Sequence, residues 1–361
     1  MKPSQSIAPP THSRECFSLT RVARVPGMRA LAWCGDQLYA ARGYELFRAR
    51  IEDQSRLQSE SVAQYRPELG RRITASNRLS ARLFRAGFHA LAVLPSGALV
   101  AAVAGAIVLW RPGDPEFQVS HRITRGTRPL HIAAVPNGAV FWGEYFDNSS
   151  RDEVHVYASP DGQTWDVAHT FPKGAIRHVH NVVYDRWENC LWILTGDYGD
   201  ECRILRADCS FSRIETVLRG NQQARAAALV PTQDGLYFSS DTPLEANFIY
   251  RLDRRGNLSR LAAISSSSIH GCQVGERIFF STMVEPSPVN RDRHVRIYAS
   301  GPGGHQWDPL LEWEKDFWPM GWFQYGNAFL PDGNNATPYL ALTTVAVKAE
   351  DQVTSIYRVS P

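Results

Sequence analysis

A segment with four apolar runs, residues 128–171, recurs with variation along most of the chain and limits its possible folds more than any other feature. The runs are rich in Val, Ile, Ala, Tyr and Trp and occupy residues 131–135, 139–145, 153–159 and 165–171. Because short turns or a polar loop join them, they leave no room for a crossover and predict an antiparallel meander. A single four-stranded sheet cannot bury its own faces, so further copies must pack beside it.

The sequence supplies seven such repeats, each opening with an apolar run that we interpret as its innermost strand. These runs begin at residues 29, 89, 131, 180, 225, 270 and 325. The last repeat is one strand short, and a lone strand expected at residues 17–25 can supply the missing one. Radial repetition leaves only short, protected sheet edges. We therefore predict an all-β fold, a seven-bladed β-propeller of four-stranded antiparallel blades closed by the N-terminal strand. A six-bladed ring with the first repeat as an appendage is the alternative.

Composition and charge limit the remaining organisation. Residues 17–361 are expected to form one β-propeller domain, with a disordered stretch at residues 1–16 and a partly helical, Arg-rich insertion at residues 52–88. A net charge of +3 gives no support for nucleic-acid binding, and no apolar run is long enough for a membrane span. The beginning of the chain lacks the apolar core of a signal peptide, which favours a cytoplasmic location. The sequence leaves the oligomeric state open.

One turn resembles a known repeat motif. Ser159-Pro160-Asp161-Gly162-Gln163-Thr164-Trp165 is similar to the Asp-box (BNR) repeat of sialidase-like β-propellers, although it is one residue short, and a degenerate copy spans residues 300–307. In this reading the Asp caps amides of a tight turn and the Trp packs between blades. The resemblance implies a fold and leaves the activity open.

The residues that open the predicted innermost strands are cationic, titratable or phenolic in all seven repeats. They are Arg29, His89, His131, His180, Arg225, His270 and Tyr325. All innermost strands of a propeller run in the same direction along its channel. We therefore expect these side chains to form a ring at one channel mouth.

The loops between second and third strands open on the same face and carry carboxylates. They contribute Glu144, Asp197, Asp241 and Glu285, and Arg177 and His178 precede the fourth innermost strand. The turns on the opposite face, of the type PSG, PNG, QDG and PDG, are minimal. Long loops on one face of a rigid scaffold are where binding residues concentrate.

Arg, His and Tyr side chains surrounded by carboxylates favour chemistry on an acidic glycan. β-Elimination of a uronate needs a cation on the carboxylate, a base and an acid. The expected carboxylate ligand is Arg225 or Arg29, the expected base and acid come from His131, His180 and His270, and Tyr325 is an alternative acid. His89, Arg177, His178, Glu144, Asp197, Asp241 and Glu285 are expected to bind substrate. Propeller-fold polysaccharide lyases are similar in the residue types at the channel mouth.

Three other interpretations stay open. A sialidase-like hydrolase would resemble the Asp-box superfamily, but only two arginines belong to the ring. A divalent metal ion could be held by His131, His180 or His270 with carboxylate partners. A non-catalytic propeller could bind a glycan or protein on the same face.

Overall fold

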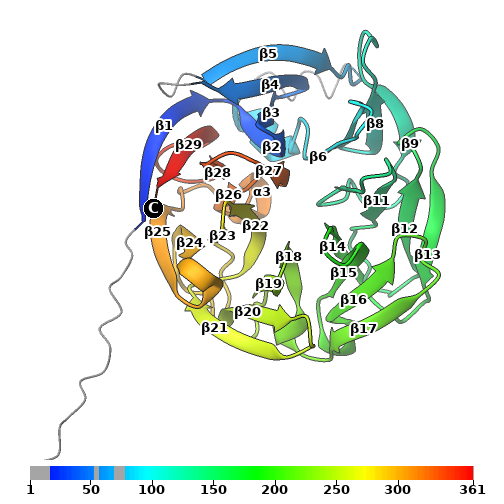
Figure 1. Cartoon of the computed structure of the whole chain (residues 1–361), viewed down its shortest axis with the longest axis vertical. Coiled ribbons are helices and arrows are strands. Elements are labelled where there is room, and N and C mark those ends of the chain that lie inside the picture. The colour runs from blue at the N-terminus through cyan, green and yellow to red at the C-terminus, as the bar shows by residue number, and fades with distance from the viewer. Residues whose placement is uncertain (1–16, 53–56, 69–77, 361) are drawn as a thin grey trace, which may run out of the picture.

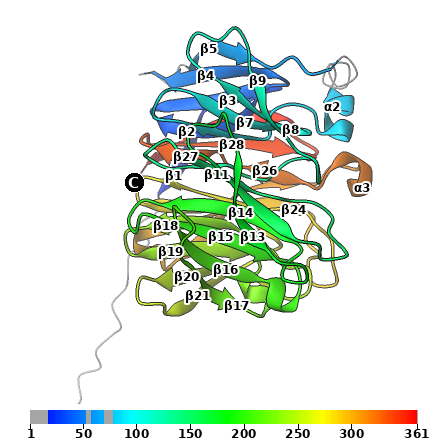
Figure 2. The same ribbon diagram turned by 90° about the vertical axis from the view of Figure 1, so that its right-hand side faces the viewer.

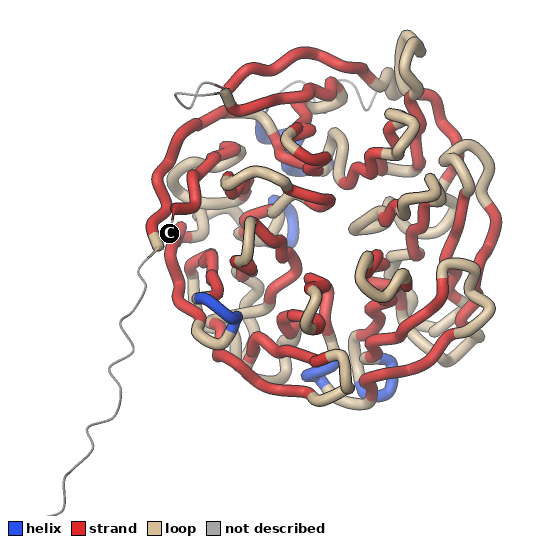
Figure 3. The backbone as a smooth tube through the Cα atoms, in the orientation of Figure 1, coloured by secondary structure: helices blue, strands red, loops and turns tan. Residues whose placement is uncertain are grey.

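The computed structural model describes residues 17–52, 57–68 and 78–360, and it confirms the predicted seven-bladed β-propeller. Seven small sheets surround a central channel (Figure 1), and strands make up most of the chain (Figure 3). The stretch expected to be disordered, residues 1–16, and residues 69–77 of the Arg-rich insertion lie outside the described residues.

The blades are numbered in the order in which their innermost strands occur, and their strands are given from the channel outward. Blade 1 contains β2 (Arg29–Gly35), β3 (Gln37–Arg42), β4 (Glu45–Ile51) and β5 (Leu57–Gln64). Blade 2 contains β6 (Ala90–Val93), β7 (Leu99–Val103), β8 (Ala106–Trp110) and β9 (Gln118–Arg122). Blade 3 contains β10 (Ala133–Ala134), β11 (Val140–Gly143), β12 (Val154–Ser159) and β13 (Asp166–Phe171). Blades 4 and 5 contain β14 (His178–Asp185), β15 (Cys190–Gly196), β16 (Arg203–Asp208) and β17 (Ile214–Arg219); and β18 (Ala226–Thr232), β19 (Gly235–Ser240), β20 (Asn247–Asp253) and β21 (Leu258–Ile264). Blades 6 and 7 contain β22 (Ser268–Val274), β23 (Arg277–Thr282), β24 (His294–Ser300) and β25 (Trp307–Glu314); and β26 (Asn327–Phe329), β28 (Tyr339–Val345), β29 (Val353–Ser360) and β1 (Ser18–Pro26).

The N-terminal strand closes the ring as predicted. β1 pairs antiparallel with β29, from Ser18 opposite Ser360 to Pro26 opposite Val353. Blade 7 therefore joins the two ends of the described chain, and its order is β26, β28, β29 and β1. This closure ties blade 7 to blade 1, because the chain continues from β1 directly into β2.

Two parts of the first and last repeats differ from the sequence-based expectation. The stretch at residues 52–88 holds β5, the outermost strand of blade 1, as well as the helix α2 (Arg78–Phe84). The expected PDG turn is part of a short strand, β27 (Asp332–Asn335), which pairs in parallel with the channel side of β2. Its Asp332 enters the channel as a consequence.

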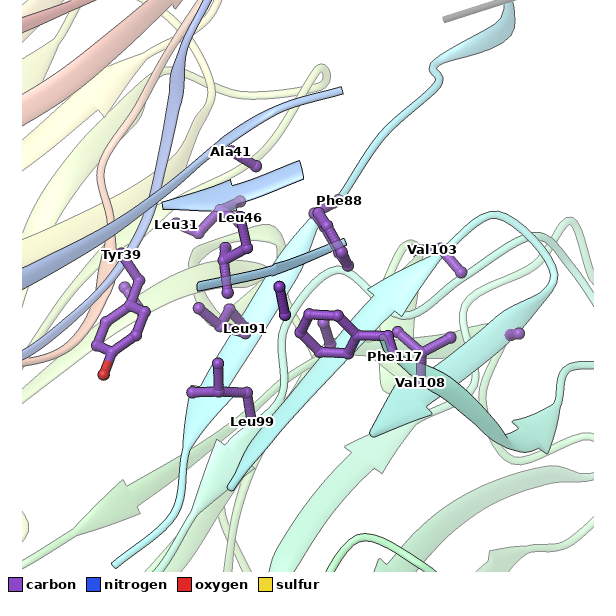
Figure 4. Packing of buried hydrophobic residues seen from close by; sticks show 14 residues of the cluster. Leu31, Tyr39, Ala41, Leu46, Phe88, Leu91, Leu99, Val103, Val108 and Phe117 are labelled. Carbon is purple, nitrogen blue, oxygen red and sulfur yellow. The ribbon is translucent and has the colours of Figure 1, made fainter. Parts of the chain in front are cut away.

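The core lies between the blades, where alternating strand residues interdigitate. Figure 4 shows the cluster between blades 1 and 2, in which Leu46, Leu91 and Phe117 are almost completely buried. Each such cluster takes residues from neighbouring blades, so no blade buries its faces alone.

The face on which the innermost strands begin, here called the top face, also carries two short helices. α2 and α3 (Met320–Phe323) extend from the same side of the disc (Figure 2). Buried Arg82 of α2 joins them: its guanidinium contacts Asp316 at 2.7 Å and Asp351 at 3.2 Å, and donates to the Phe323 carbonyl at 2.8 Å. None of the helices in the described part of the chain has the length and apolar character needed to cross a lipid bilayer.

The Ser159–Trp165 turn fastens blade 3 to blade 2. Ser159 Oγ accepts from the Gly162 amide at 2.7 Å, and Asp161 Oδ1 accepts from the Gln163 amide at 2.9 Å. Gly162 has a φ of +80° and lies against Val100 of blade 2, where a Cβ would clash. Trp165 Nε1 donates to Ser120 Oγ of blade 2 at 3.1 Å. The turn thus has a structural role between the blades.

Candidate functional site

Bulges in the innermost strands decide which predicted ring residues share a level of the channel. The pairing register shifts at Leu31 in β2, at His180 in β14, at Ala227 in β18 and at Ile269 in β22. Counting from these bulges, Arg29, His178 and Arg225 occupy equivalent positions. His180 is two residues deeper, and His270 is three residues deeper than Arg225. The predicted ring is therefore spread over more than one level.

His178 and His180 form a buried group with Asp197, which follows β15. The two Nε2 atoms are 3.0 Å apart, and they lie 3.5 Å and 3.3 Å from Asp197 Oδ1. Burial lowers the pKa of His180. Burial alone would raise the pKa of Asp197, but the two imidazoles outweigh it and hold that pKa well below its usual range. Among the described residues, the potential metal-ligating atoms of these three side chains lie within 4.8 Å of one another. The predicted set of His131, His180 and His270 forms no such group there.

Carboxylates dominate this side of the mouth, which we call the anionic half: Asp197, Asp241 and Glu285. Arg225 Nη2 lies 3.2 Å from Asp197 and 3.8 Å from Asp241, and Arg177 Nη1 lies 3.2 Å from Asp197. Burial, with Glu285 and Asp197 nearby, raises the pKa of Asp241 to about 7. Burial also raises the pKa of Glu285. A carboxyl group that titrates near neutral pH is suited to general acid–base chemistry.

The opposite side, called the cationic half, gathers Arg29, Arg85, Arg128 and His89. Arg29 Nη1 donates to His89 Nδ1 at 3.2 Å, and the Arg29 guanidinium lies over the Phe329 ring. Burial and mutual repulsion lower the pKa of Arg128 to about 9, and burial lowers that of Arg29 to about 10. Within the described part of the chain, the guanidiniums of Arg29, Arg85 and Arg128 form no ion pair with a carboxylate. A cavity of about 570 Å³ beside this half is lined by Arg29, Arg85 and His89, and also by Glu350 and Asp351.

Tyr145 lies between the two halves. Its ring centroid is 4.3 Å from that of His178, and its phenol is close enough to Arg128 to influence that residue's pKa. Burial, together with Asp241, Asp197 and Glu285, raises the pKa of Tyr145 to about 12. The phenol therefore keeps its proton at neutral pH and can donate it.

His131 and His270 lie deeper in the channel, and His270 is still close enough to Arg29 for the two side chains to interact electrostatically. Their ring centroids are 5.7 Å apart, His131 Nδ1 contacts Asp332 at 2.9 Å, and His270 packs on Phe329. His131 and Asp332 line a separate cavity of about 1000 Å³, which extends to the turns of the lower face. The structure thus places these two predicted catalytic residues deeper in the channel than His178 and Arg225.

Two further predicted residues, Glu144 and Tyr325, differ in burial and in their contacts. Buried Glu144 pairs with Arg125 and accepts from the His155 amide at 2.8 Å, so its oxygens are occupied. Tyr325 is 37% exposed at the mouth, where burial and Glu285 raise its pKa and Arg85 opposes them.

Sequence reasoning missed Arg85, Arg128 and Tyr145. Arg128 stands three residues before His131, much as Arg177 precedes the fourth innermost strand, and Tyr145 follows the predicted loop residue Glu144. The sequence positions of Arg128 and Tyr145 could therefore have indicated that these residues lie at the mouth. Arg85 lies just beyond α2 with a φ of +50°, within the Arg-rich insertion predicted at residues 52–88.

Comparisons with known proteins support the architecture. No family model matches the sequence, and a search of curated proteins gives no match. A chain in a crystal structure of the mitotic checkpoint complex superposes with a TM-score of 0.57 at 12% identity, covering 100% of this chain and 98% of that one. A chain in a crystal structure of the nidogen/laminin complex gives a TM-score of 0.49 at 11% identity over 80% of this chain and 95% of that one. At these identities the first likeness shows the β-propeller fold alone.

Proposed function

We propose that the top face binds an acidic, uronate-type glycan and cleaves it by β-elimination. The supporting observation is the division of the mouth: guanidiniums without a carboxylate partner on one side face buried acid–base groups on the other. A substrate carboxylate would sit against Arg29, Arg85 and Arg128, since a guanidinium pairs well with a planar anion. The sugar ring would then extend toward Tyr145 and Asp241.

The proposed reaction uses Asp241 as the base and Tyr145 as the acid. Asp241, whose pKa is raised to about 7, would take the proton from the carbon next to the carboxylate. That carbon's electron pair forms the new double bond, and the bond from the adjacent carbon to the glycosidic oxygen breaks. Tyr145 would give its proton to the departing oxygen. Positioned acids and bases contribute about 10²–10⁴-fold each. We assign no step to His131 or His270 because they lie deeper in the channel.

Sialidase-like hydrolysis is the second candidate, and the three arginines of the cationic half favour it. That route resembles a carboxylate held by an arginine triad and attacked by a tyrosine nucleophile. A nucleophilic tyrosine needs to lose its proton readily, whereas burial raises the pKa of Tyr145 to about 12. This observation places elimination ahead of hydrolysis.

The test is an incubation of the whole chain with a panel of uronate oligosaccharides and sialosides. Elimination creates a conjugated double bond that absorbs ultraviolet light, whereas hydrolysis releases reducing ends without that absorbance. Absorbance that grows with wild type and is lost with Asp241→Asn supports the proposal. Reducing ends alone would support the hydrolase, and binding without turnover of any substrate would leave a glycan-binding platform.

A further inference from the structure

The protonation pattern of His178 and His180 is set by their backbone partners. His178 Nδ1 lies 3.0 Å from the Phe146 carbonyl oxygen, and His180 Nδ1 lies 3.0 Å from the Ala226 carbonyl oxygen. A carbonyl oxygen only accepts, so each Nδ1 carries the proton. In the neutral imidazoles both Nε2 atoms therefore present lone pairs.

These two lone pairs and a carboxylate converge on one point. The Nε2 atoms are 3.0 Å apart, and Asp197 Oδ1 is 3.5 Å from the first and 3.3 Å from the second. All three residues are buried. These three atoms repel one another unless a proton or a metal ion lies between them.

The charged side chains around His178, His180 and Asp197 favour a bound cation. Four carboxylates, of Asp147, Asp197, Asp241 and Glu285, surround two guanidiniums, of Arg177 and Arg225. The four carboxylates outnumber the two guanidiniums, so a cation bound to this group would have anionic surroundings. Arg225 and Arg177 contact Asp197 themselves, but a carboxylate oxygen has lone pairs for both an N–H donor and a metal ion.

We propose that His178 Nε2, His180 Nε2 and the Asp197 carboxylate bind one divalent first-row transition metal ion. Ligand atoms bound about 2.1 Å from a tetrahedral ion lie about 3.4 Å apart, which is close to the observed spacings. Nδ1–H donation to a carbonyl is the usual way in which a protein orients a ligating histidine. Two imidazoles and one carboxylate suit Zn²⁺ or Fe²⁺ and leave coordination positions open, as in catalytic sites.

Direct binding tests the proposal without any glycan. Chelator-treated whole chain is titrated with ZnCl₂ by calorimetry, and with Co²⁺ by visible absorption. We expect one ion per chain, and His180→Gln to weaken binding by more than the 10- to 100-fold that a lost orienting group costs. His169→Asn, which removes a histidine of the outermost strand β13, is the matched control and retains full affinity. Absence of binding to wild type, or unchanged affinity in His180→Gln, would overturn the proposal.

A second measurement does not depend on the folding of a variant. X-ray absorption of the Zn²⁺-loaded wild type should show two imidazoles and oxygen ligands. A sulfur ligand would overturn the proposal, because buried Cys202 lies nearby, with its Sγ 3.6 Å from Gln222 Nε2. Neither result depends on elimination, so a protein that binds zinc but leaves uronates intact would refute only the proposed function.

Discussion

The two halves of the top mouth handle charge in opposite ways. In the anionic half, each guanidinium has carboxylate partners: Arg225 contacts Asp197 and Asp241, and Arg177 contacts Asp197 and Asp147. In the cationic half, Arg29 and Arg128 are held close to each other, and burial lowers both their pKa values. Partly buried guanidiniums without a carboxylate partner are costly and are candidate sites for an anionic ligand. The comparison therefore points to an anionic ligand on one half and proton chemistry on the other.

The largest expected effect comes from Tyr145, where the halves meet. Tyr145→Phe removes the proposed proton donor and keeps the ring against His178. Turnover of a uronate substrate should fall by about 10²–10⁴-fold with the binding constant nearly unchanged. Steady-state and binding measurements on Tyr157→Phe, a tyrosine of β12, supply the control. Equal turnover in Tyr145→Phe and wild type would remove Tyr145 from the mechanism.

The next prediction concerns the buried ion pairs of Arg82, which join α2 and α3 beside the cationic half. Arg82→Met leaves the buried carboxylates of Asp316 and Asp351 without their guanidinium, which should lower the free energy of unfolding by about 3–5 kcal/mol. Arg48→Met breaks an exposed pair with Glu60 and should cost less than about 1 kcal/mol. Urea denaturation measures both. A loss for Arg82→Met as small as that for Arg48→Met would show that the α2–α3 junction is not held by this ion pair.

Arg128→Gln tests the cationic half directly. Loss of a charge-assisted hydrogen bond should weaken uronate binding by about 1.5–3 kcal/mol, which is roughly 10- to 150-fold. Arg122→Gln, on the exposed end of β9, should bind as wild type does. Calorimetric titration compares the three proteins, and unchanged affinity in Arg128→Gln would place the carboxylate elsewhere.

The pH dependence of the free energy of unfolding tests the anionic half. The Asp241 carboxyl loses its proton near pH 4 in the unfolded chain and at about 7 in the folded protein. Between these values the folded state binds more protons, so this group's contribution to stability falls as the pH rises. From pH 5 to pH 8, Asp241→Asn should gain about 2–3 kcal/mol relative to wild type. Denaturation at both pH values measures it, with exposed Asp166→Asn as control. A gain no larger than the control's would contradict the raised pKa.

The sequence was informative wherever repetition set the geometry. Repeated apolar runs predicted seven blades, and the missing last strand predicted closure by β1. The common direction of the innermost strands predicted that one mouth holds Arg29, Arg225, Asp197 and Asp241.

Local irregularities were not predictable in the same way. Counted from the bulge at His180, the residue level with Arg29 and Arg225 is His178 and not His180, because an inserted residue changes the count along only one strand. β27 departs from the repeat and brings Asp332 to His131, and Arg85 reaches the mouth from a connection that no other blade shares. Each depends on long-range packing that a repeat pattern does not contain.

The most direct test of the central claim compares two ligands that differ only in charge. Calorimetric titration of wild type with a uronate trisaccharide, and with the same trisaccharide after reduction of its carboxyl groups, isolates the carboxylate's contribution. Guanidiniums without a carboxylate partner among the described residues predict that the acidic form binds at least about tenfold more tightly, a difference of about 1.4 kcal/mol. Equal affinity for the two forms would contradict an anion-binding role for the cationic half.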